Sequence, residues 1–295
     1  MEIINDSWSR LEKFGNSICT AKYNPLNWLG AISCFLFLIL ALTGFYLFLF
    51  YEISAAKAYQ SVEHITVSQW YFGGVMRSIH RYASAGLILS MTLHTIQMLA
   101  KSRYRSRRWL TWVSGVSSIW IIIFVGLVGY IMVWDERALF IARTFTPLLD
   151  NLSLFTNPPS LAFLKMPSTL FFRVIFFMHL TIPVLLLFLF GIHLLRMGKA
   201  KMILPKVLMY MLVAAFLIIS LISPATSGPP ADINMLPAEV NFDWFYMFFF
   251  PLFEVMTVPA VWGVLSISTL VLFFVPWYGK GGKKVKSQNL SPNKI

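Results

Sequence analysis

Charged residues are scarce in this sequence: only 12% of its 295 residues are Asp, Glu, Lys or Arg, and 58% are hydrophobic. Soluble globular proteins carry about 25% charged residues, so this composition excludes an ordinary soluble domain. Cysteine is also nearly absent, and Cys19 and Cys34 cannot make a disulfide framework. The sequence contains no Cys-X-X-Cys-His motif and no cysteine–histidine motif of the Rieske type. Any c-type heme or iron–sulfur cluster that works with this chain would belong to another subunit.

The sequence instead contains long apolar runs. Six are long enough to span a bilayer, and a seventh, which contains Glu254, is shorter. They are residues 27–51, 82–100, 109–134, 174–195, 207–231, 244–256 (the short run) and 255–279. Because no backbone polar group can stay unpaired in lipid, these spans must be helices. We therefore expect an all-α polytopic membrane protein with seven spans: a four-helix bundle and three further helices.

Residues 1–26 differ from these runs. They contain several charged residues and lack the short apolar core of a signal peptide. Their apolar side chains recur with a spacing that suits an amphipathic helix on the membrane surface.

The basic residues predict the orientation of the chain. Between the second and third spans, and between the fourth and fifth, lie Lys101, Arg103, Arg105, Arg107, Arg108, Arg196, Lys199, Lys201 and Lys206. By the positive-inside rule these loops face the cytoplasm or its equivalent, the n side, and the opposite face is the p side. The net charge of +12 is thus explained by membrane topology without nucleic acid. Seven spans put the basic tail, residues 280–295, on the p side, against the rule. Either the tail is a basic p-side extension or the sixth segment does not cross; we keep seven spans.

Four of the five histidines form two pairs, His80 with His94 and His179 with His193, each separated by 14 residues. On an α-helix this spacing puts both imidazoles on one face, about 21 Å apart. Two such helices side by side offer two imidazole pairs at two depths, the geometry for two six-coordinate hemes. A lone apolar histidine is usually a core residue, but intramembrane histidines mark function, and the repeat favours ligands.

Insertion direction assigns the partners. Both histidine helices run from the p side to the n side, so we expect a p-side His80–His179 heme and an n-side His94–His193 heme. Arg77 and Arg81 flank His80, and arginine suits carboxylates such as heme propionates. His64 has no partner at this spacing and is expected at the surface.

Two glycine pairs, Gly30 with Gly44 and Gly115 with Gly129, repeat the 14-residue separation in the first and third spans. Glycine weakens a helix interior by about 0.5–1 kcal/mol, so a matching period needs a reason. We expect these positions to let two flat heme faces lie against the backbone. Ordinary small-residue helix packing is the alternative.

These features together resemble cytochrome b of bc1 and b6f complexes over most of residues 24–277. Beyond the histidines and glycines, the segment 129–135 (GYIMVWD) is similar to the family's GYxLPW segment, with Val133 replacing its proline. The stretch 224–254 resembles the loop that carries the family's PEWY motif. The resemblance implies a b6-like heme-binding domain at 27–200 and a subunit-IV-like domain at 201–279.

The resemblance also implies a function. The chain would be the diheme cytochrome b subunit of a quinol oxidoreductase complex, passing electrons from quinol through both b hemes with coupled proton translocation. It would be the quinone-reactive subunit of a quinol:cytochrome c-type oxidoreductase, inactive alone. Iron–sulfur or cytochrome c subunits would be partners, within a homodimeric complex in an energy-transducing membrane such as the bacterial cytoplasmic membrane.

The quinol region departs from the family, because Asn241-Phe242-Asp243-Trp244-Phe245 stands at the PEWY position. Asp243 replaces the glutamate that accepts a proton in the family. Glu254, a carboxylate within the sixth segment, is a second proton-path candidate; burial against another subunit is its alternative. Ungapped alignment puts the family's extra heme anchor at Leu36, so we expect no c-type heme at Cys34.

Two other functions stay open. A simpler b-heme anchor subunit of a dehydrogenase or a ferric-reductase-like complex would also need the histidines, but not two quinone sites. A non-redox transporter with structural histidines would show no reducible heme b spectrum.

Overall fold

The computed structural model describes residues 2–105, 108–150, 169–195, 203–235 and 243–278, which form helices and no strand. The α-helices are α1 (Glu2–Tyr23), α2 (Leu29–Phe50), α3 (Ala58–Glu63), α4 (Val75–Ala100), α5 (Trp109–Val133), α6 (Glu136–Asp150), α8 (Thr169–Leu195), α9 (Lys206–Ile222), α10 (Phe250–Val255) and α11 (Val258–Phe274). Short 3₁₀ turns cover Pro25–Asn27 and Val275–Trp277, and π-helical turns cover His64–Ser68 and Trp70–Gly74.

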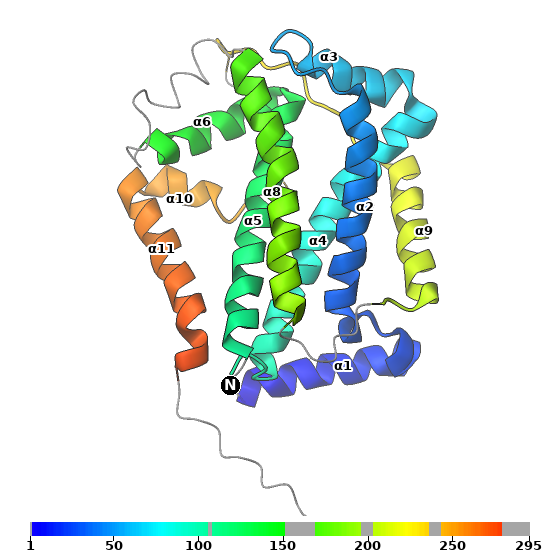
Figure 1. Cartoon of the computed structure of the whole chain (residues 1–295), viewed down its shortest axis with the longest axis vertical. Coiled ribbons are helices and arrows are strands. Elements are labelled where there is room, and N and C mark those ends of the chain that lie inside the picture. Colours follow the sequence, from blue (N-terminus) through cyan, green and yellow to red (C-terminus); the bar gives the residue numbers. More distant parts are fainter. Residues whose placement is uncertain (1, 106–107, 151–168, 196–202, 236–242, 279–295) are drawn as a thin grey trace, which may run out of the picture.

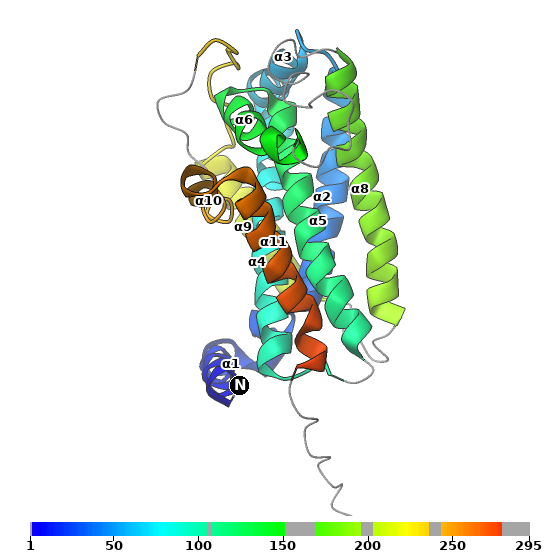
Figure 2. The ribbon, with the colours of Figure 1, turned by 90° about the vertical axis from the view of Figure 1, so that its left-hand side faces the viewer.

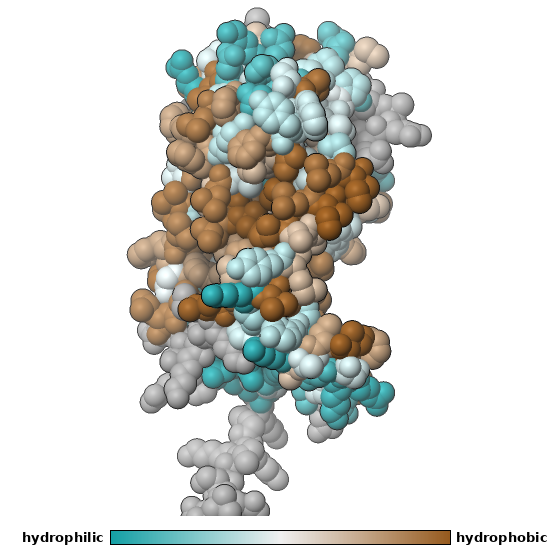
Figure 3. Space-filling model, turned by 90° about the vertical axis from the view of Figure 1, so that its right-hand side faces the viewer, coloured by the Kyte–Doolittle hydropathy of each residue, from teal (hydrophilic) through white to brown (hydrophobic). Residues whose placement is uncertain are grey.

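Helices α2, α4, α5 and α8 form an elongated bundle (Figures 1 and 2), in which α2 packs on α4 and α5 packs on α8. These four, and α11 together with the turn that follows it (Val258–Trp277, 20 residues), are long and apolar enough to cross a membrane; α9 is an apolar helix of 17 residues. A band of hydrophobic side chains separates two more polar ends on the face seen in Figure 3. The all-α polytopic fold is thus confirmed, and the chain is an integral membrane protein.

The sixth expected span, residues 244–256, is not a membrane-crossing helix. Its last part forms α10, which has six residues and is about 9 Å long, whereas the hydrocarbon layer is about 30 Å thick. Proline explains the interruption. Pro251 and Pro259 are the second residues of α10 and α11, and proline is tolerated in the first turn of a helix but not in its interior. Met256 and Thr257, between the two helices, are extended.

Without that crossing, α11 ends on the side where α1 lies (Figure 1). Two contacts place its end beside the start of α5: Nε1 of Trp112 donates to the carbonyl of Leu272 at 2.7 Å, and the Trp109 and Trp277 rings lie 5.4 Å apart. The basic loop 101–108 precedes α5, so this end is the n side. The conflict with the positive-inside rule came from counting the sixth segment as a span. The tail 280–295 itself lies outside the described residues.

Helix α1 lies across the n-side end of the bundle (Figure 1). Ile4, Leu11, Phe14 and Ile18 form an exposed apolar stripe along it. An interface-bound amphipathic helix has such a stripe, so membrane contact of α1 stays our prediction.

Sidedness can be measured with a membrane-impermeant maleimide. Cys19 on α1 is exposed and serves as the n-side reporter. In variants that each keep a single cysteine, we expect Tyr278→Cys at the end of α11 to react from the same side as Cys19. Lys57→Cys, exposed beside α3, should react from the opposite side. If Tyr278→Cys instead reacts from the same side as Lys57→Cys, the chain has the seven-span topology.

Candidate functional site

The first imidazole pair meets between α4 and α8. The ring centroids of His80 and His179 are 6.3 Å apart, with 57° between the ring planes. Two metal–imidazole bonds of about 2 Å each, on opposite sides of one iron, separate ring centroids by about 6 Å. The spacing of this pair therefore fits two histidines that would hold the iron of a single heme.

The second pair lies towards the n side. His94 and His193 line one pocket, together with Gly115, Met98, Thr95, Trp112, Thr111, Arg103 and Arg108. The structure thus brings together the two pairs that the chain direction predicts, His80 with His179 and His94 with His193.

Each predicted glycine lies directly against one imidazole. A Cβ atom added at Gly30 would be 3.3 Å from Cε1 of His94, and one at Gly44 would be 3.0 Å from Cε1 of His80. The corresponding distances are 3.4 Å for Gly115 and His193, and 2.9 Å for Gly129 and His179. The glycines therefore make room for the ligand rings, a reason that differs from the expected contact with heme faces. Heme contact at these glycines stays a prediction.

In three of the four imidazoles, a hydrogen bond at Nδ1 sets the tautomer. Nδ1 of His179 donates to the carbonyl of Val125 at 3.1 Å. Nδ1 of His80 lies 3.0 Å from Oγ1 of Thr43, which already donates its proton to the carbonyl of Ile39. We therefore assign Nδ1 of His80 as the donor. A donating Nδ1 leaves the Nε2 lone pair for a metal.

At the n-side level, Nδ1 of His193 is also a donor to a hydroxyl group. This nitrogen lies 3.0 Å from Oγ of Ser114, and that hydroxyl donates to the carbonyl of Thr111. His94 differs, because its buried Nδ1 has no hydrogen-bond partner in the described part of the chain. Sequence reasoning missed Thr43 and Ser114. Their signal was available, since each is the hydroxyl residue immediately before a paired glycine, Gly44 or Gly115.

The pocket of the second pair also offers donors for carboxylates. Arg103 and Arg108 line it, and Oγ1 of Thr111 is buried without a hydrogen-bond partner among the described residues. Arginine and hydroxyl donors match heme propionates. The residues present therefore fit a heme at this depth.

The two p-side arginines are engaged within the protein. Arg77 donates to Oγ1 of Thr66 and to Oγ of Ser227 at 2.8 Å, and lies 3.6 Å from the carboxylate of Glu63. It thereby joins α4 to the loop after α9. Propionate binding by Arg77 stays a prediction, and would have to share the guanidinium with these partners.

Arg81 joins a cluster with Tyr130 and Asp243. Its Nη1 donates to the Tyr130 hydroxyl at 2.7 Å, and its Nη2 donates to Oδ1 of Asp243 at 2.9 Å. The Tyr130 hydroxyl donates in turn to Oδ2 of Asp243. Sequence reasoning missed Tyr130 as a site residue, although it follows Gly129 directly.

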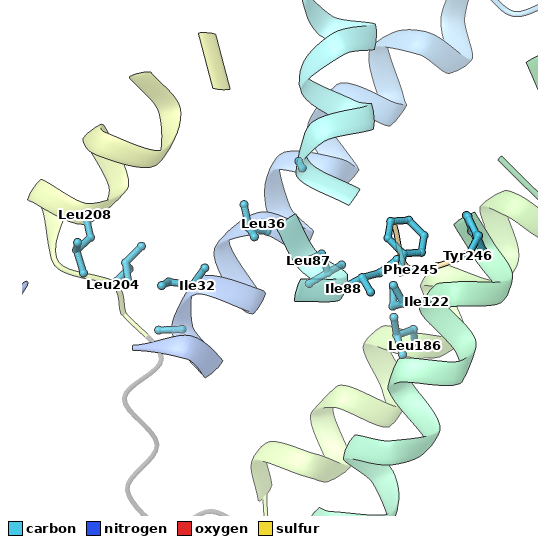
Figure 4. Close-up of a cluster of buried hydrophobic side chains, with 12 residues drawn as sticks. Ile32, Leu36, Leu87, Ile88, Ile122, Leu186, Leu204, Leu208, Phe245 and Tyr246 are labelled. Atoms are coloured by element: carbon cyan, nitrogen blue, oxygen red, sulfur yellow. The ribbon is translucent and has the colours of Figure 1, made fainter. Parts of the chain in front are cut away.

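Two aromatic residues anchor the segment that begins at Asp243. The fully buried Tyr246 donates its hydroxyl to the carbonyl of Ile123 at 3.0 Å, and a Cβ at Gly126 would lie 2.5 Å from that hydroxyl. Phe245 packs into the core cluster that includes Ile122 (Figure 4). This packing fixes the approach of Asp243 to α4 and α5.

The other predicted residues lie apart from the cluster. Glu254 is exposed on α10, and the turns at 243–249 mean that it does not share a continuous helix with Asp243. The Cys34 thiol donates to the carbonyl of Gly30 at 2.9 Å. His64 is exposed, as expected.

The chain is similar to known proteins in sequence and in fold. The family model for cytochrome b/b6/petB matches residues 16–202. Cytochrome b6 of Desmonostoc sp. is 37% identical over 122 residues, and that of Mastigocladus laminosus is 35% identical over 122 residues; each alignment covers 40% of this chain and 56% of the relative. The chain thus spans about half the length of these curated relatives.

The fold also has a solved counterpart. A structure described as "Hyperthermophilic respiratory Complex III" superposes with a TM-score of 0.70 at 20% identity, covering 85% of this chain and 75% of the other. At that identity the similarity shows the fold.

Gly129→Ala tests the contact between glycine and imidazole. The new methyl group would lie 2.9 Å from Cε1 of His179, and overpacking of this kind costs about 1–3 kcal/mol. We expect purified Gly129→Ala protein to hold less heme b and to retain the His94–His193 heme. The matched control is Gly191→Ala, also in the bundle, where an added Cβ meets nothing within 4 Å. Equal heme content in both variants would contradict this role of Gly129.

Proposed function

The chain belongs to the cytochrome b/b6 family, and from this premise we propose that it is the diheme cytochrome b subunit of a quinol-oxidising membrane complex. The carrying observation is the pair of facing imidazoles His80 and His179, 6.3 Å apart. The second pair, His94 and His193, shares one pocket. Because the two levels are about 21 Å apart along the helices, they support an electron route across most of the bilayer.

A b-type heme, when bound at each level, would carry one electron at a time. The chain's own contribution is positioning. Thr43, Val125 and Ser114 orient three imidazoles through Nδ1, and the glycines let the rings approach α2 and α5. Lipid-facing apolar side chains on the bundle keep water from both levels.

Asp243 is the proposed proton acceptor for quinol on the p side. Oxidation of a quinol to a quinone releases two electrons and two protons, and the Asp243 carboxylate would take one of these protons. Arg81 and Tyr130 both donate to that carboxylate, so they hold it in place. Arg81 follows His80, and Tyr130 follows Gly129, which lies against His179, so this cluster is at the same level of the bundle as the first imidazole pair.

The remaining assignments follow from this role. The p-side electron acceptor would be an iron–sulfur protein or a cytochrome c, and a second quinone would take electrons near the n side. We further propose a heme-binding unit at 27–200, a subunit-IV-like unit at 201–279, and a homodimeric complex in a bacterial cytoplasmic membrane. A simpler heme anchor would not need the Arg81–Tyr130–Asp243 cluster.

Redox titration of the purified protein's heme b spectrum tests the diheme proposal. We expect two midpoint potentials. His94→Leu should remove one, because the n-side site would lose one of the two histidines that hold its heme, while the other persists. His64→Leu, which removes an exposed histidine, is the control and should keep both. A single potential in the wild-type protein would contradict the proposal, and no reducible heme would favour a non-redox transporter.

Asp243→Asn tests the proton acceptor. An amide cannot accept the proton, and general base catalysis contributes about 100-fold or more. We expect quinol-driven reduction of the hemes in the complex to slow by about that factor at unchanged heme content, with partial recovery in Asp243→Glu. Asp232→Asn, at an exposed carboxylate of the same region, should behave as wild type. An unchanged rate in Asp243→Asn would remove Asp243 from the mechanism.

A further inference from the structure

His94 is the exception among the four imidazoles. In the other three, Nδ1 pairs with Thr43, Val125 or Ser114. Nδ1 of His94 is buried and has no formed hydrogen bond within the described residues. A buried unpaired N–H costs about 1–3 kcal/mol, so this ring calls for an acceptor.

The backbone acceptor expected at His94 is already occupied. At Gly129, the carbonyl four residues earlier, Val125, accepts from His179. The equivalent carbonyl before Gly30 belongs to Leu26, and it accepts from Nε2 of Gln97 at 2.8 Å. Gln97 thus donates to the carbonyl that corresponds to the one that accepts from His179 at the p side.

Two acceptors fix the orientation of the Gln97 amide. Its Nε2 donates to the Leu26 carbonyl and also to Oε1 of Glu12 at 2.9 Å. Since neither partner can donate, the amide nitrogen must face them, and Oε1 faces away. Gln97 is buried and lies one turn after His94 on α4, on the same face of that helix.

Glu12 is well suited to hold this amide. Burial opposes its charged form, but hydrogen bonds from Lys101, Gln97 and Trp8 outweigh that effect and lower the pKa of Glu12. The carboxylate is therefore ionised at neutral pH and remains an acceptor. Gln97 is on α4 and Lys101 follows its last residue, whereas Glu12 and Trp8 are on α1.

We propose that Gln97 is the positioning residue of His94: its amide oxygen accepts the Nδ1 proton of the n-side ligand, and Glu12 of the surface helix α1 holds the amide in that orientation. This inference rests on the proposed diheme function. It makes α1 part of the n-side redox site. An acceptor at Nδ1 raises the basicity of a ligating imidazole, which favours the oxidised iron and lowers its reduction potential.

Redox titration of the purified holoprotein tests the proposal, with the n-side potential identified as the one that His94→Leu removes. Gln97→Leu should make that potential more positive, with about a tenfold change in the reduction equilibrium, or about 59 mV. The p-side potential should stay unchanged. Gln97→Glu retains an acceptor oxygen and should not shift the n-side potential in the positive direction.

A matched control separates this role from simple anchoring of α1. Trp8→Phe removes another hydrogen bond to Glu12 without touching the Gln97 amide, and it should leave both potentials unchanged. If Gln97→Leu does not retain heme, Glu12→Ala tests the same claim, because it removes one of the two acceptors that orient the Gln97 amide. A positive shift of the n-side potential alone would then support the proposal.

Two outcomes overturn it. An unchanged n-side potential in Gln97→Leu, or in Glu12→Ala if that variant replaces it, means that Gln97 is structural only. An equal shift of both potentials means a general electrostatic effect. Either result leaves the diheme proposal intact, whereas a wild-type protein without reducible heme b would contradict the proposed function itself.

Discussion

The structure depends on burying four imidazoles in apolar helices and on pairing their polar nitrogens, which contacts at Nδ1 do for three of the four within the described residues. A buried polar group is costly unless it is hydrogen-bonded. At His179, the missing side chain of Gly129 lets the ring reach the backbone of α5, where the Val125 carbonyl accepts from Nδ1. At His80 the acceptor is the Thr43 hydroxyl. Once Nδ1 is engaged, Nε2 faces into the bundle, where a metal can bind.

This constraint explains the order of the bundle. The histidines are on α4 and α8, and the glycines and hydroxyl acceptors are on α2 and α5, so each level is built from both kinds of helix. Polar groups outside these levels join the peripheral segments to the bundle. Arg81 and Tyr130 hold Asp243 at one end, and Lys101 and Gln97 hold Glu12 at the other.

Sequence periodicity predicted the helices and the histidine partners because both depend on chain direction and helical repeat. It also located the glycines, although their contacts with the imidazoles needed three-dimensional packing. The sixth segment was misjudged because hydropathy ignores the breaks that Pro251 and Pro259 impose. The Arg81–Tyr130–Asp243 cluster joins residues 162 positions apart, which no local pattern could reveal. Gln97 escaped notice since its partners Glu12 and Leu26 come from other segments.

The most direct test of the central claim is an experimental density map of the purified holoprotein at a resolution that shows side chains. We predict two hemes, one with its iron between His80 and His179 and the other between His94 and His193. In both, the glycines of α2 and α5 should contact the ligand rings. A single heme, or iron bound by residues other than these four histidines, would contradict the account.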